Sequence, residues 1–162
     1  MNQCAATCNT DAVTWLWSGG AADCIIVAAY ANHRAYITHV DRLTDEGDWL
    51  PALGRAMGGE RARVYLASTA VNNNPGGLLA NVREALNRTA DRWEAITEVN
   101  STSFAISAVG GATLSNLVTG HLNGPPPRGM GFGEVYWSLP RPAARVQKKF
   151  AVSKGGAKES PF

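Results

Sequence analysis

The chain of 162 residues has few charged side chains, few cysteines and almost no lysine. Charged residues make up 17% of the sequence against 45% hydrophobic residues, which excludes a chain that is disordered throughout. The three cysteines exclude a disulfide framework, because an odd count leaves at least one thiol outside any pair. The length predicts one domain, which we place at residues 1–153, followed by a disordered basic tail at 154–162.

Patterns that bind metals, nucleotides or membranes are also missing from the sequence. There is no C-x-x-C and no H-x-x-x-H, and the histidines are only His33, His39 and His121. The H-x-E and P-C-x-x-C strings of zinc deaminases, the G-x-G-x-x-G string and the P-loop are absent. The start of the chain does not resemble a signal peptide, and the apolar run 24–31 is too short to span a membrane. We therefore expect neither a metal nor an organic cofactor, and no membrane partner.

Positive charge is concentrated near the end of the chain. Residues 139–162 sum to +5 and the rest of the chain to −3, and all four lysines lie at or after Lys148. An acidic body with a basic tail is not typical of a nucleic-acid-binding domain, so we expect no nucleic-acid partner. A body without lysine suits a protein that escapes ubiquitination in a eukaryotic cell. A codon preference for arginine explains it equally well.

The hydrophobic pattern predicts seven strands and two helices. The expected strands are residues 13–18, 24–30, 35–41, 63–68, 96–100, 103–109 and 134–139, with hairpins at 24–41 and 96–109. The first helix is expected at 49–57, capped by Asp48 and ended by Gly58. The second is expected from Pro75, with Asn74 as its N-cap, to about residue 90. Residues 123–133 are expected to form a loop, and no repeat is evident.

Cys24 and His39 are the candidates for chemistry. An even hairpin loop centred on Ala31 and Asn32 would place them directly opposite each other, with Cβ atoms about 4.5–5.5 Å apart. A cysteine this close to a histidine forms an ion-paired thiolate, which is a strong nucleophile. Backbone N–H groups of the small-residue turn at 19–23 could then form an oxyanion hole. An odd loop would change the register, and the ordinary alternative is a buried cysteine with an unrelated histidine.

The residues around this pair resemble a known group of enzymes. The strings are S-G-G at 18–20, C-I-I-V at 24–27 and Y-I-T-H-V-D at 36–41. They are similar to the active-site hairpin of the Cys–His protein deamidases, which include the cytotoxic necrotizing factors, a lethal factor that deamidates a translation initiation factor, and the chemoreceptor glutamine deamidase. The C-h-I-V-V and T-H-x-D strings of the N-terminal asparagine amidohydrolases are closest. Several members carry a threonine hydroxyl six residues before the cysteine, where this chain has Ser18.

The resemblance implies an α+β fold with two packed β-sheets flanked by helices, in four layers (α/β/β/α). It also implies that Cys24 attacks a glutamine or asparagine side-chain amide, that His39 transfers protons, and that Ser18 orients His39, with Asp41 as a competing orienter. We therefore expect a protein substrate in a target cell, and secretion or delivery as a bacterial effector or toxin. We also expect a cognate inhibitor or immunity protein and a monomeric state. An amidase acting on N-terminal asparagine, and a non-catalytic binding module on the same fold, are the alternatives.

Overall fold

The computed structural model describes residues 3–10, 14–69, 75–115 and 149–151. The strands are β1 (Gln3–Cys8), β2 (Trp15–Ser18), β3 (Ile25–Ala31), β4 (Arg34–Val40), β5 (Ala62–Ser68), β6 (Trp93–Asn100), β7 (Phe104–Ser107), β8 (Thr113–Ser115) and β9 (Lys149–Ala151). The helices are α1 (Glu46–Met57), α2 (Leu78–Asn87) and the short 3₁₀ helix η2 (Ala90–Arg92). The expected strand 134–139, the loop 123–133 and the tail 154–162 lie outside the described residues.

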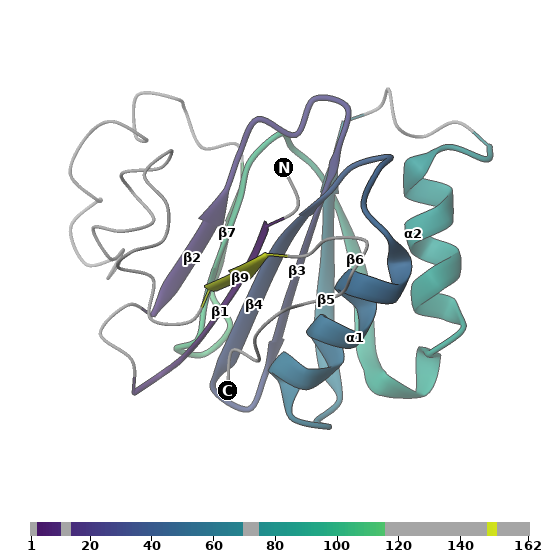
Figure 1. The fold of residues 1–162 in the computed structure, drawn as a ribbon. Coiled ribbons are helices and arrows are strands. Elements are labelled where there is room, and N and C mark those ends of the chain that lie inside the picture. Colours follow the sequence, from purple (N-terminus) through teal and green to yellow (C-terminus); the bar gives the residue numbers. More distant parts are fainter. Residues whose placement is uncertain (1–2, 11–13, 70–74, 116–148, 152–162) are drawn as a thin grey trace.

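The strands form two sheets. Six strands are arranged in the order β6-β5-β3-β4-β1-β9, where β5 and β6 are parallel and the other neighbours are antiparallel. Three strands form an antiparallel sheet in the order β2-β7-β8. Both α-helices cover one face of the six-stranded sheet, and the smaller sheet covers the other (Figure 1). Within the described residues, no helix is long and apolar enough to cross a membrane.

Strand β3 shows how the sequence produces this layering. Its side chains alternate between two cores: Val27 and Ala29 pack against the helices, whereas Ile26 and Ala28 pack against the smaller sheet. A continuous apolar run is required because both faces of the strand are buried. The expected α+β class with two packed sheets is confirmed, and the described residues provide three layers, one helical and two of sheet.

The hairpin between β3 and β4 differs from the expected register. Its turn consists of Asn32 and His33, which both have positive φ, at 41° and 64°. That backbone is the one that a two-residue hairpin turn of type I′ requires, and asparagine and histidine adopt it more readily than most residues. The loop is therefore centred one residue later than expected, so His39 pairs with Ile26 and not with Cys24. The predicted direct opposition of Cys24 and His39 is wrong.

The second expected hairpin, at 96–109, is also wrong. β6 lies parallel to β5 at the edge of the large sheet, and β7 pairs with β2 in the small sheet. The reason is α2, which buries Leu79, Val82 and Leu86 against the large sheet. A chain that crosses over such a helix returns as a parallel strand. The turn around Ser101, whose N–H donates to the Ser68 carbonyl at 3.0 Å, then leads the chain into the other sheet.

Both helices begin at other residues than expected. α1 begins at Glu46 because the Asp45 carboxylate accepts the Gly47 N–H at 2.8 Å as its N-cap, and Asp48 lies inside the first turn. Gly58, with φ of 65°, ends this helix as expected.

The second helix also begins later in the chain. α2 begins at Leu78 and not at Pro75, because Gly76 has a left-handed φ of 74° that a helix cannot contain. The predicted N-cap Asn74 lies outside the described residues.

Candidate active site

The ends of strands β2 to β7 meet at one end of the two sheets. The pairings that bring them there are Ile25 with Val40, Ile26 with Ala67, Ser68 with Asn100, and Ser18 with Phe104. The connections 19–24, 41–45 and 101–103 therefore lie near one another, and α1 begins at the same end. All three residues expected to carry chemistry, Ser18, Cys24 and His39, are located here.

Ser18 and His39 are joined across the two sheets. Ser18 is the last residue of β2, and His39 lies on the face of β4 that packs against the smaller sheet. Ser18 Oγ and His39 Nδ1 are hydrogen-bonded at 3.2 Å in a partly buried setting. The contact expected between these two side chains is present. Because it uses Nδ1, it leaves Nε2 of the imidazole to act on another group.

Cys24 lies on the same side of the large sheet as His39. It comes directly before β3, is half-buried, and packs against the core between the sheets. Since Ile26 is the direct partner of His39, continuing the register beyond Ile25 and Val40 would place Cys24 diagonally from the histidine. Such diagonal neighbours are about 7–8 Å apart and remain within reach of long or aromatic side chains. Ser18 and His39 are thus in contact, and Cys24 lies at the same end and on the same face of the sheet, although by a different register from the expected one.

Burial shifts the pKa values of both Cys24 and His39. Burial raises the pKa of the Cys24 thiol above its ordinary value, and the negative charge of Asp41 raises it further. Burial also lowers the pKa of His39, against the opposing effect of Asp41. Both shifts favour a neutral thiol beside a neutral imidazole over the thiolate–imidazolium pair that the sequence suggested. A neutral His39 can serve as a general base for the thiol.

The turn before Cys24 uses part of its backbone internally. The Ala21 N–H donates to the Thr102 carbonyl and the Ala22 N–H donates to the Gly20 carbonyl, each at 3.0 Å. Gly20 has a φ of 75°, which favours glycine. Two of the expected oxyanion donors are therefore already engaged, and an oxyanion would have to be bound by the other N–H groups of the turn.

Two residues that the sequence did not single out hold this turn in place. The Thr69 hydroxyl, just after β5, donates to the Ala22 carbonyl at 2.9 Å, and Thr102 accepts from Ala21. Gly19 lies so close to the Trp17 ring that a Cβ there would come within 2.3 Å of it. No local sequence pattern marks Thr69 or Thr102, because their hydrogen-bond partners are distant in sequence. The contact of Gly19 with the Trp17 ring depends on how the two sheets pack.

Asp41 caps the turn that follows β4. Its Oδ1 accepts the Leu43 N–H at 2.9 Å and the Thr44 hydroxyl at 2.8 Å. Burial raises the pKa of this carboxyl and these hydrogen bonds lower it, and the net pKa is lowered. Asp41 is therefore a negative charge close to Cys24, and Ser18 makes the hydrogen bond to His39.

The remaining candidates lie elsewhere. His33 is exposed at the hairpin turn, and His121 lies outside the described residues. Cys4 is buried in the core under the helices, where burial raises the pKa of its thiol, and Cys8 Sγ contacts Thr10 Oγ1 at 3.1 Å. Within the described part of the chain, no three His, Cys, Asp or Glu side chains group together as metal ligands.

Comparison with known proteins adds no relative to this description. Neither the models of known protein families nor the curated proteins contain a match to this chain.

Proposed function

We propose that the protein is a cysteine-dependent amidohydrolase that deamidates glutamine or asparagine side chains of a protein substrate. The observation that carries the proposal is the hydrogen bond between Ser18 Oγ and His39 Nδ1 on the face of the sheet to which Cys24 belongs. A nucleophile, a base and a group that orients the base are the minimum that such a reaction requires.

The α+β layers support the same proposal. The helical layer, the six-stranded sheet and the three-stranded sheet correspond in kind to three of the four layers of the enzymes that the sequence resembles. We propose that the complete chain forms the four-layer arrangement.

The reaction begins with a neutral pair. His39 Nε2 takes the proton from the Cys24 thiol as the sulfur attacks the amide carbon, while the Nδ1–H of His39 donates to Ser18 Oγ. The tetrahedral intermediate collapses as His39 returns the proton to the leaving nitrogen, which departs as ammonia and leaves a thioester. Water, deprotonated by His39, then attacks the thioester. The products are the carboxylic acid and the Cys24 thiol, which is restored by the proton that His39 holds.

Action inside a eukaryotic target cell, as a secreted or delivered effector, is part of the proposal. Residues 3–115 contain no lysine, so this part of the chain offers no side-chain amine for ubiquitin. A protein that enters a foreign cytosol benefits from such a surface.

The decisive test is deamidation by variants of the proposed nucleophile and base. We expect Cys24→Ser and His39→Ala to lower the release of ammonia from a target-cell lysate by about 100- to 10,000-fold while the circular dichroism spectrum stays unchanged. Cys8→Ser is the matched control, because Cys8 is half-buried like Cys24 but contacts Thr10. Mass spectrometry of the lysate proteins identifies the converted residue. Full ammonia release by either folded variant would refute the mechanism.

A further inference from the structure

A cleft of about 620 Å³ opens on the helical face of the large sheet. The segment that follows β4 and the first turn of α1 form one wall, and α2 forms the other. The two helices lie side by side on this face (Figure 1). None of Ser18, Cys24 and His39 lines this cleft, which is on the opposite face of the sheet from them.

The cleft follows α2 along its whole length. Its lining includes Gly77 at the start of the helix, Asn81 in the middle and Arg88 at the end. A helix rises 1.5 Å per residue, so this wall is about 16 Å long. An extended peptide rises about 3.3 Å per residue, so the cleft has room for about five residues of such a chain.

The apolar core of the helical layer lies beneath the cleft, but the surface that lines the cleft is mainly polar. Trp49 of α1 and Val82 and Ala85 of α2 are buried beneath it, and Leu78 is partly buried against the same core. A mainly polar lining favours a ligand that is held by hydrogen bonds and charge over one that is held by apolar contacts.

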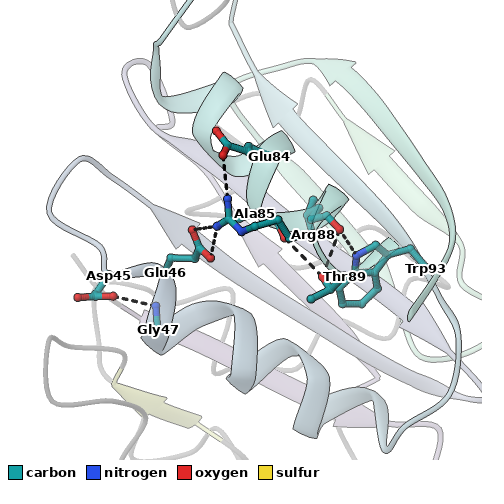
Figure 2. Close-up of polar contacts among 9 residues, drawn as sticks. Asp45, Glu46, Gly47, Glu84, Ala85, Arg88, Thr89 and Trp93 are labelled. Atoms are coloured by element: carbon teal, nitrogen blue, oxygen red, sulfur yellow. Dashed lines mark hydrogen bonds and ion pairs between the residues drawn. The ribbon is translucent and has the colours of Figure 1, made fainter. Parts of the chain in front are cut away.

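The walls carry more negative than positive charge. Arg88 pairs with Glu84 at 3.0 Å and with Glu46 across the two helices (Figure 2), so one guanidinium neutralises only one of two carboxylates. Asp41 and Arg42 balance each other in the wall next to β4. The net charge of the lining is therefore −1, which favours a basic ligand.

Asp41 connects the cleft to the candidate active site. It lines the end of the cleft nearest β4, and its charge acts on the Cys24 thiol. Continuing the hairpin register beyond Ile25 and Val40 places Cys24 opposite Asp41. A chain that lies along α2 would have to pass round the end of β4 at Asp41 to reach the thiol on the other face of the sheet.

We propose that this cleft binds an extended segment of the protein substrate that carries basic side chains beside the amide to be hydrolysed. The identity of the bound segment as substrate rests on the proposed function, whereas its length and charge follow from the cleft alone. Glu84 is the specificity-determining residue, because its side chain is 72% exposed and supplies a charge that Arg88 shares with Glu46.

The test measures binding without turnover, on the Cys24→Ser chain. The probes are two fluorescein-labelled nine-residue peptides with a central glutamine, one flanked by two arginines and the other by two glutamates. Fluorescence anisotropy should show about tenfold tighter binding of the arginine peptide, from a few exposed charge pairs. Glu84→Lys should reduce this preference to about twofold or less, since it replaces an attraction by a repulsion.

Glu94→Lys is the matched control, because Glu94 is an exposed glutamate that pairs with Arg63 on β6 and does not line the cleft. It should retain the full preference. Asn81→Trp fills the cleft from α2 and should weaken both peptides. Equal binding of the two peptides, or the same loss in Glu84→Lys and Glu94→Lys, would overturn the proposal. A retained preference with no deamidation by the unsubstituted chain would support the cleft and refute the enzyme.

Discussion

Removal of the Ser18 hydroxyl probes the hydrogen bond on which the proposed mechanism depends. Ser18→Ala deletes the oxygen that lies 3.2 Å from His39 Nδ1 and leaves a half-buried imidazole nitrogen without that partner. A hydrogen bond of this kind is worth about 0.5–1.5 kcal/mol net. If the whole amount is lost as the imidazole gains charge, turnover falls by about 2- to 12-fold, since 1.4 kcal/mol corresponds to a factor of ten.

Three measurements separate an orienting role from a structural one. An orienting hydroxyl should affect kcat more than KM, because it acts when His39 accepts the proton. Alkylation of Cys24 by iodoacetamide, followed against pH, reports the same change without a substrate. The melting temperature reports any loss of folding stability. Ser18→Thr keeps the hydroxyl and suits the end of a strand, so it should restore most of the turnover.

A structural role would give a different pattern. If Ser18 only ends β2 and supports the turn at Gly19 and Gly20, the alanine variant would melt at a lower temperature but turn over normally per folded molecule. That result would refute the orienting role of Ser18. The role would then pass to Asp41 or to a backbone carbonyl.

Two further predictions follow from burial and close packing. Because burial lowers the pKa of His39 below its ordinary value of 6.5, the unfolded chain binds a proton first as the pH falls, so stability should be lower at pH 5 than at pH 7. Urea unfolding at both pH values should show this loss in the unsubstituted chain and a smaller one in His39→Gln; equal losses would contradict it. Gly19→Ala should cost about 1–3 kcal/mol of unfolding free energy, because the new methyl group meets the Trp17 ring. A melting temperature equal to that of the unsubstituted chain would show that the ring moves aside freely.

Much of the secondary structure was predictable because its signals are local. The apolar run of β3 and the helical spacing of Leu79, Val82 and Leu86 each mark an element without reference to the rest of the chain. Strand partners carry no such signal. The sequence of residues 96–109 does not indicate that β6 pairs with β5 and β7 with β2, since these pairings depend on how α2 covers the sheet.

β1 was missed for a related reason. Its described inward side chains, Cys4 and Ala6, are small, so the segment shows no strong alternation. The strand is stabilised by pairing with β4, which needs a neighbour on the side away from β3. A short strand of small residues is visible only once its neighbour is placed.

At the candidate site, the face on which each residue lies was predicted correctly although its hairpin partner was not. Side chains alternate with a period of two, so a hairpin that slips by two positions keeps every residue on its expected face. The turn at Asn32 and His33 is centred one residue later than expected, so the partner of each residue moves by two positions. His39 therefore still faces Ser18 and lies on the same face as Cys24. A slip of one would have turned the imidazole toward the helices. The even number of residues in the turn places the three residues on one face, whichever residue is directly opposite His39.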